Sequence, residues 1–244
     1  MKQNIRIHKA EVNQGILNYS HLLDAPAGKH GFVETKQGHL YFEDGLRARF
    51  LGFNVAARSN TPDHETADKM AERFESMGVN LIRLHAADAP VGEGPGSWSS
   101  CKEAPLLDYA SGTSRKFNPE GLDRFDYFVA KLKEKGIYLH IDLIVARAFL
   151  PGDDMEYPGG APSCLKRHTM YNARMIQLQK EYAKELLCHV NPYTGLALID
   201  DPTVVTIQIN NEDSAIKWVM EALGPSDSPV VRVFLTDLQF PVFL

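Results

Sequence analysis

Apolar and polar positions alternate along the chain in an order that predicts strand, helix, strand, several times over. The strand-like stretches are short, nearly continuous apolar runs, typical of strands buried on both faces of a parallel sheet: Arg49–Asn54, Val79–His85, Ile137–Ile144 and Val204–Asn210. Between them, apolar residues recur every three or four positions, as on one face of an amphipathic helix, within 63–77, 119–135 and 172–189. This alternation predicts an α/β fold with a parallel sheet.

Local signals place some of the element ends. The order Asn118-Pro119-Glu120 suits a helix start, with a capping side chain, a first-turn proline and a first-turn acid. Gly78 and Gly136 suit the left-handed position that ends a helix. Upstream, residues 31–48 hold two short strand-like runs, and Asp44-Gly45 predicts a hairpin turn.

Two features favour a (β/α)8 TIM barrel over an open doubly wound sheet. The segment Gly52–Val55 lacks the glycine-rich phosphate loop of a dinucleotide-binding domain. Polar residues gather at the expected carboxyl ends of the strands, where TIM barrels carry their chemistry: Asn54, Arg83, His85, Asn211 and Glu212. We expect one domain over residues 1–244, with the first four or so strand–helix units of a barrel after a short N-terminal β-hairpin.

Composition narrows the class of protein. The chain has 44% hydrophobic and 23% charged residues, ordinary for a globular protein, and its net charge of -5 gives no indication of a nucleic-acid partner. No apolar run reaches the length of a membrane-spanning helix. The N-terminal residues lack the apolar run of a signal peptide, and three widely spaced cysteines predict free thiols. Together these features favour a cytoplasmic location.

Glu212 is the leading candidate for chemistry. It comes just after a predicted buried strand, where we expect partial desolvation to disfavour the charged form, as a general acid requires. Glycoside hydrolysis needs such an acid and a second carboxylate across the scissile bond, and the amide of Asn211 suits a sugar hydroxyl. An alternative is that Asn211-Glu212-Asp213 simply begins the next helix, whose positive end favours acids.

The order of motifs resembles the clan A glycoside hydrolases, in particular the cellulase-like family 5 group. Val204–Glu212 resembles the fourth-strand Asn-Glu motif of that group, and Gly78–His85 resembles its second strand with the arginine. Phe53-Asn54-Val55 and Lys135–Leu143 fit the first and third strands. The resemblance covers about residues 31–214. It implies a retaining glycosidase that acts on O-glycosidic bonds of a poly- or oligosaccharide, without cofactor or metal.

Matched position by position, the resemblance implies Glu212 as general acid/base, Asn211 as a ligand of the sugar 2-hydroxyl, and Arg83 as the residue that orients the nucleophile. Four further residues are expected to bind substrate: His85, Asp88, Asn54 and Arg147. For Asp88 the alternative is a polar loop start, and for Arg147 it is a loop-anchoring or surface role. Tyr109 and Trp98 either stack on sugar rings or hold down the long second loop.

The sequence departs from the family in one serious respect. Clan A enzymes carry the nucleophilic glutamate after the seventh strand, and no position here matches it. Residues 224–244 form an atypical tail, which predicts a truncated or frame-shifted end. A half barrel would expose its edge strands, so we expect the isolated chain to be poorly soluble, self-associating or inactive.

Two other functions stay open from the residues alone. His85 with Asp88, and His140 with Asp142, offer nitrogen and oxygen ligands for a divalent metal ion, as in a metal-dependent TIM-barrel hydrolase. His140 and Asp142 share one face of a strand but lie in its middle, which argues against a metal site at the strand end. A non-catalytic carbohydrate-binding protein is the other alternative, because the nucleophile is missing.

Overall fold

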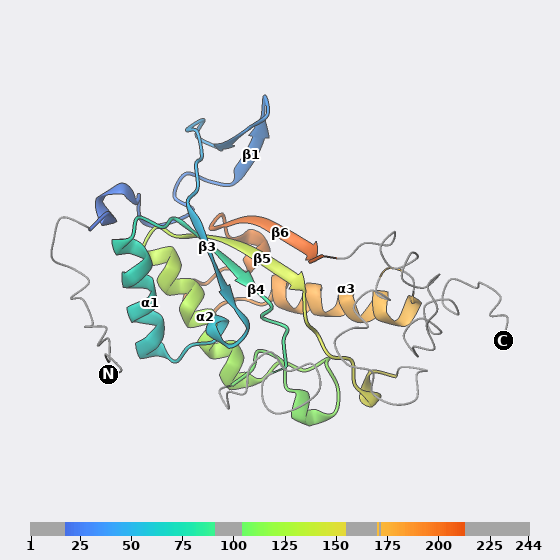
Figure 1. Ribbon diagram of the computed structural model, residues 1–244. Helices are drawn as coiled ribbons and strands as arrows, with labels where there is room; N and C mark the ends of the chain where they lie inside the picture. The colour runs from blue at the N-terminus through green and yellow to red at the C-terminus, as the bar shows by residue number, and fades with distance from the viewer. Residues whose placement is uncertain (1–17, 91–103, 155–169, 171, 213–244) are drawn as a thin grey trace, which may run out of the picture.

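A computed structural model describes residues 18–90, 104–154, 170 and 172–212 (Figure 1). The strands are β1 (Val33–Lys36), β2 (His39–Phe42), β3 (Gly52–Ala56), β4 (Leu81–His85), β5 (Tyr138–Ile144) and β6 (Val204–Asn210). The helices are α1 (His64–Ser76), α2 (Pro119–Glu134) and α3 (Ala173–Cys188). Short 3₁₀ helices span Ser20–Leu22, Ala57–Asn60, Tyr109–Ser111, Pro151–Asp153 and Leu198–Asp200.

The central sheet confirms the predicted parallel α/β fold. Its four strands are all parallel and lie in chain order, β3-β4-β5-β6, as consecutive strands of a barrel do. The first strand was predicted too early: β3 begins at Gly52 because the ring of Phe50 packs against Phe42 and Tyr138. Asn54 therefore lies in the middle of its strand, not at the carboxyl end as expected.

Side-chain caps start the helices largely where the sequence predicts. Asn118 accepts hydrogen bonds from the backbone N–H groups of Glu120 and Gly121, and Asn172 caps α3 in the same way. Gly78 and Gly136 follow α1 and α2 with φ of 71° and 78°, the left-handed region that glycine enters without strain. Met77, the last residue of the predicted helix 63–77, lies at the C-cap of α1 and is exposed, so the apolar face of the helix ends before it.

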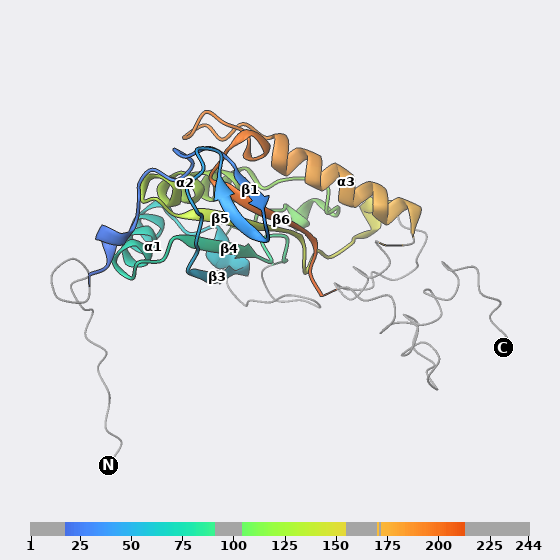
Figure 2. The same ribbon diagram turned by 90° about the horizontal axis from the view of Figure 1, so that it is seen from above.

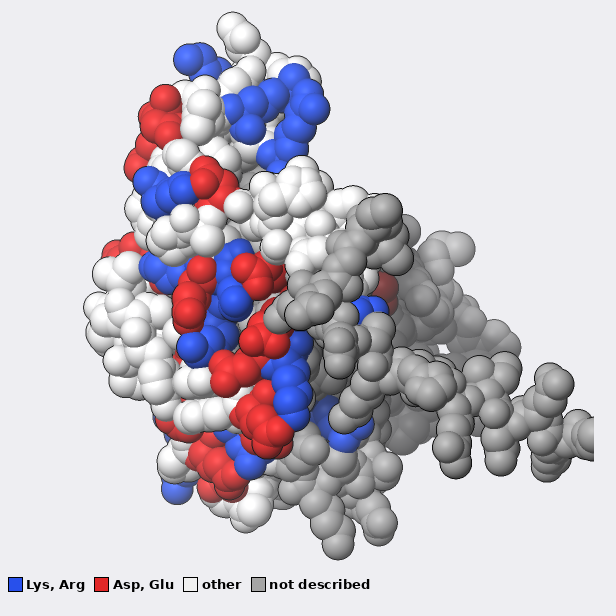
Figure 3. Space-filling model, turned by 90° about the vertical axis from the view of Figure 1, so that its left-hand side faces the viewer, with Lys and Arg blue, Asp and Glu red and all other residues white. Residues whose placement is uncertain are grey.

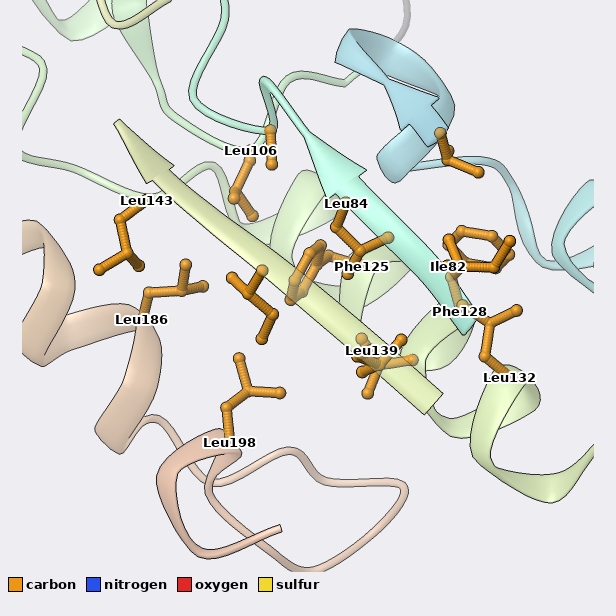
Figure 4. Close-up of a cluster of buried hydrophobic side chains, with 14 of the residues drawn as sticks. Ile82, Leu84, Leu106, Phe125, Phe128, Leu132, Leu139, Leu143, Leu186 and Leu198 are labelled. Atoms are coloured by element: carbon orange, nitrogen blue, oxygen red, sulfur yellow. The ribbon is translucent and has the colours of Figure 1, made fainter. Parts of the chain in front are cut away.

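The outer face of the sheet carries the hydrophobic core. Viewed from above, α1 and α2 lie side by side against the sheet and α3 extends beyond them (Figure 2). Alternate residues of β4 and β5, such as Ile82 and Leu139, point toward Phe125, Phe128 and their neighbours on the helices (Figure 4). All four of these side chains are completely or almost completely buried. Packing of this layer fixes the sheet and leaves its other face for polar groups.

A β-hairpin precedes the sheet and projects from the body of the molecule near the start of β3 (Figure 1). β1 and β2 pair in antiparallel fashion around Gln37 and Gly38, both with positive φ, and a second turn at Asp44-Gly45 follows. The sequence predicts two strand-like runs broken at Gly38, and the first turn lies there; the hairpin turn that it assigned to Asp44-Gly45 is the second turn. The ring of Phe42 lies 5.4 Å from that of Tyr138 at the start of β5. The hairpin thereby contacts the amino-terminal end of β5, opposite the carboxyl ends that carry the candidate chemistry.

Two surface features bear on partners. Within the described residues, β3 and β6 each have one unpaired edge, and their outward side chains Phe53, Ile207 and Ile209 are exposed. Self-association through these edges stays a prediction. On the side that carries α1, Lys and Arg alternate with Asp and Glu, so this face shows no continuous basic stripe (Figure 3). None of the helices in the described ranges is long and apolar enough to cross a membrane.

Candidate active site

Polar side chains line the inner face of the sheet, opposite the hydrophobic core. The parallel register places Asn54, Arg83 and His140 side by side on successive strands, with Asp142 next to Gln208 one layer nearer the carboxyl ends. Side chains on a strand alternate between faces, so these residues share the face that the core residues leave. The sheet therefore carries a polar surface where a barrel would have its interior.

Asp142 is the centre of a network on this face. Its side chain is fully buried and lies 2.8 Å from Nη2 of Arg83, on the neighbouring strand, and 2.5 Å from Nδ1 of His85. Nε2 of His140 lies 3.0 Å from Asp142 Oδ1. Burial alone would raise the pKa of Asp142, but the two histidines and Arg83 outweigh it and lower the pKa below its usual value. Asp142 is therefore an anion held among donors.

Arg83 connects this anion to the predicted catalytic segment. Its Nη2 atom donates to Gln208 Oε1 at 2.9 Å and to Asn211 Oδ1 at 2.8 Å. Asn211 is 7% exposed, and its backbone N–H donates to the carbonyl of Ile144 at 2.9 Å. Arg83 and Asn211, which the sequence singled out from segments 128 residues apart, are thus in direct contact.

Glu212 lies directly after this anchored residue, as the sequence predicts. It has a φ of 53°, a left-handed conformation that is uncommon outside glycine, and its side chain is exposed. Among the described residues nothing buries Glu212, so the partial desolvation that the sequence predicts stays a prediction. Asp213 and the residues of the alternative helix lie outside the described part of the chain.

Asp88 does not line an open subsite. It is 0% exposed, and its carboxylate accepts hydrogen bonds from the backbone N–H groups of Val145, Ala146 and Arg147 at 2.8 to 3.2 Å. The expected substrate contact is therefore wrong, since the side chain is fully used in holding the segment after β5. Burial raises the pKa of Asp88, against the opposing effect of these donors and of Arg147.

Arg147 is likewise a loop anchor, the alternative that the sequence left open. It is 1% exposed and donates to the hydroxyl and carbonyl oxygens of Ser114 and to the carbonyl of Leu178. Its guanidinium also lies over the rings of Phe149 and Tyr182. No part of it is available to a sugar, which corrects its assignment to the substrate site.

Other expected residues divide between the site and the scaffold. Asn54 is exposed on the inner face level with Arg83, and His85 is half-buried at the carboxyl end of β4. Both positions are compatible with the predicted substrate contacts. The hydroxyl of Tyr109 donates to the carbonyl oxygen of Asp88 at 2.6 Å, and burial raises the pKa of this phenol. Tyr109 is thus an anchor of the second loop, and Trp98 lies outside the described residues.

The sequence missed the role of Asp142 and Gln208. It considered Asp142 only as a metal ligand, although strand alternation and the order of the parallel strands would have placed it beside Arg83. Gln208 gave no signal beyond its even spacing from Asn210. No group of three or more metal-ligating side chains forms among the residues that the structure describes. Both oxygen atoms of the Asp142 carboxylate already contact Arg83 or His85. This arrangement therefore orients the side chains around Asp142.

Comparisons with known proteins identify structures of similar fold. No protein-family model matches the sequence, and no curated protein matches it. Among solved structures, an endo-1,4-beta-mannanase from Rhizomucor miehei matches with a TM-score of 0.54 and 22% identity over 75% of this chain and 48% of its own. A glycoside hydrolase family 5 mannosidase from the same organism matches with a TM-score of 0.56 and 15% identity, over 85% of this chain and 54% of its own.

The likeness shows the fold. The chain spans about half the length of these enzymes, and its parallel sheet corresponds to part of a TIM barrel, as predicted. At 15 to 22% identity, what these proteins act on does not carry over with the fold. The function has to be argued from the site.

Proposed function

We propose that the chain belongs to the cellulase-like family 5 group of clan A glycoside hydrolases and that Glu212 acts as the general acid/base in cleavage of O-glycosidic bonds. The observation that carries the proposal is the hydrogen bond between Arg83 and Asn211. It fixes the residue next to Glu212 on the polar face of a partial TIM barrel. A glutamate at that position meets a bound sugar at the carboxyl ends of the strands.

The chemistry follows from this placement. Glu212 donates a proton to the glycosidic oxygen as the bond to the anomeric carbon breaks, and a second carboxylate stabilises that carbon from the other side. In a retaining enzyme the two carboxyl groups stand about 5–5.5 Å apart, and Glu212 then takes the proton from the attacking water. No residue of this chain is assigned as the second carboxylate. Because Glu212 is exposed, the bound sugar itself has to exclude water from the reacting groups.

The remaining polar residues would bind the sugar. The side chain of Asn211 is held by Arg83 and Gln208, which leaves its orientation defined for a hydrogen bond to the sugar 2-hydroxyl. Asn54 and His85 face the same side of the sheet. Because the similar structures are a mannanase and a mannosidase, we propose β-mannosidic bonds as the first substrate to test.

Substitution of the acid tests this function. The chain and its Glu212→Gln variant are compared on β-mannan and other β-linked polysaccharides, and on aryl glycosides with a good leaving group. Azide or formate is added in every assay, because it can take the place of the second carboxylate that this chain lacks. Loss of the acid should lower kcat on polysaccharides by about 10²–10⁴-fold. The loss on activated aryl glycosides should be much smaller, because their leaving group needs no proton. Glu65→Gln, an exposed glutamate on α1, is the matched control and should change neither rate.

Two results would overturn the proposal. Equal losses on both kinds of substrate in Glu212→Gln would contradict proton donation by this residue. A wild-type chain that binds oligosaccharides in calorimetry but cleaves no glycoside, even with azide or formate in place of the absent nucleophile, would contradict the enzyme and would favour the carbohydrate-binding alternative.

A further inference from the structure

The buried carboxylate of Asp142 has no part in the proposed bond cleavage, yet the polar groups of the inner face converge on it. Arg83 approaches it with two nitrogen atoms, Nε at 3.2 Å from Oδ1 and Nη2 at 2.8 Å from Oδ2. His85 reaches the same Oδ2 atom with Nδ1 at 2.5 Å. The two partners lie on β4, and Asp142 lies on β5. A single carboxylate thus holds the two β4 side chains nearest the candidate site.

The geometry restricts the states of both partners. An ionised carboxylate only accepts hydrogen bonds, so Nδ1 of His85 carries the proton in this contact. The planar guanidinium of Arg83, held at two of its nitrogens, has a fixed orientation. In that orientation the same Nη2 atom also reaches Asn211 at 2.8 Å. A continuous chain of contacts therefore joins Asp142 through Arg83 to Asn211, and through one peptide bond to Glu212.

We propose that Asp142 is a positioning residue for this site: it sets the orientation of Arg83, and through it that of Asn211 and Glu212, and it fixes the proton of His85 on Nδ1. The proposal rests on the proposed glycosidase function for its effect on catalysis, but not for its effect on His85. Support from the surrounding groups of metal and catalytic sites commonly contributes 10- to 100-fold to activity.

A purely structural role for Asp142 predicts a different outcome. Were Asp142 needed only for packing, Asn would replace it well, because the two side chains have nearly the same shape. Asn offers one oxygen instead of two. With that oxygen toward His85, the amide nitrogen faces Nε of Arg83, so two donors oppose each other and Arg83 must move.

The test compares Asp142→Asn with Asp126→Asn. Asp126 is a matched control, because it is also a buried aspartate paired with a histidine, His189 at 2.7 Å, but it lies on α2 outside the polar face. Asp142→Asn should lower kcat on polysaccharide about 10- to 100-fold with a change in KM below about threefold. Asp126→Asn should leave kcat unchanged within about twofold, even where it lowers the melting temperature.

A second measurement is independent of activity. Nitrogen-15 NMR of the imidazole groups, with His85 assigned from a His85→Gln variant, should show Nδ1 protonated in the wild-type chain and a changed pattern in Asp142→Asn. A wild-type His85 with its proton on Nε2 alone, or an Asp142→Asn enzyme with kcat within about threefold of wild type, would overturn the proposal. If Asp142→Asn does not fold, the wild-type spectrum decides. If the wild-type chain hydrolyses nothing, the proposed function fails. The NMR measurement still decides whether Asp142 fixes the proton of His85 on Nδ1.

Discussion

The buried carboxylate of Asp88 gives the most direct test of how the loops around the site are held. It accepts hydrogen bonds from the backbone N–H groups of three consecutive residues after β5, with N···O distances of 2.8 to 3.2 Å. Asp88→Ala removes every one of these acceptors and leaves three buried donors, each costing about 1–3 kcal/mol when unsatisfied. Loss of a desolvated charge offsets part of that cost. We therefore expect the free energy of unfolding to fall by about 3 kcal/mol.

A graded series sharpens this prediction. The atom Oδ2 of Asp88 accepts from Val145, Ala146 and Arg147, whereas Oδ1 accepts only from Ala146. Asp88→Asn with its oxygen in the Oδ2 position keeps an acceptor for all three N–H groups and no longer buries a charge, but its amide nitrogen then faces the N–H of Ala146. Its cost should therefore be about 1 kcal/mol, well below that of Asp88→Ala. Asp200→Ala, an exposed aspartate, is the control and should change stability by less than about 0.5 kcal/mol.

Urea unfolding followed by circular dichroism and by fluorescence measures these differences, provided that both probes report one transition. Amide hydrogen exchange gives the local readout: the N–H groups of Val145, Ala146 and Arg147 should exchange faster in Asp88→Ala. A loss below about 1 kcal/mol in Asp88→Ala, or an Asn variant as damaged as the Ala variant, would refute the assignment of Asp88 as a backbone anchor.

Three other substitutions test the scaffold. Arg147→Met should lower the free energy of unfolding by about 3 kcal/mol, because buried carbonyl oxygens lose their hydrogen-bond donor. A loss below about 1 kcal/mol in urea unfolding would argue against Arg147 as an anchor. Gly121→Ala should destabilise by about 2 kcal/mol despite a better helix propensity, since a Cβ would lie 2.0 Å from the carbonyl oxygen of Pro105; a gain in melting temperature would contradict this. His30 donates to Asp24 and Asp44, and these hydrogen bonds raise its pKa. Its contribution is thus complete below about pH 6.5 and lost as pH rises through the raised pKa, so the stability gap to His30→Gln should narrow with rising pH and vanish in alkali.

Helices and strand order were predictable because their signals are local. Asn118 and Gly136 act through the backbone of their own neighbours, and the apolar period of α2 reports its buried face directly. The start of β3 was harder to predict, because Phe50 lies before the strand and packs on Tyr138, a residue 88 positions away in the chain. A run of apolar residues does not distinguish a strand from a segment that packs elsewhere.

The same distinction between local signals and distant contacts applies to the candidate site. Arg83, Asn211 and Glu212 were predicted as site residues from short motifs, and the structure brings the first two into contact. Asp88 and Arg147 carry the same chemical groups as substrate ligands, and only their burial and their backbone partners mark them as anchors. A polar residue after a strand end has two possible environments, and sequence alone does not choose between open space and a neighbouring loop.

The polar inner face bears on why this sheet carries Arg83 and Asp142 at all. Interiors of TIM barrels are filled mainly by branched aliphatic side chains, and buried ion pairs contribute little to stability relative to apolar residues of similar volume. A sheet selected for stability alone would have continued the pattern of Ile82 and Leu139 on both faces. Here Ile82, Leu84, Leu139 and Ile141 keep to the outer face, while charged and amide side chains from β4, β5 and β6 bond to one another on the inner face. Since stability does not explain this choice, the network is better explained by the orientation that it gives to Asn211, next to Glu212.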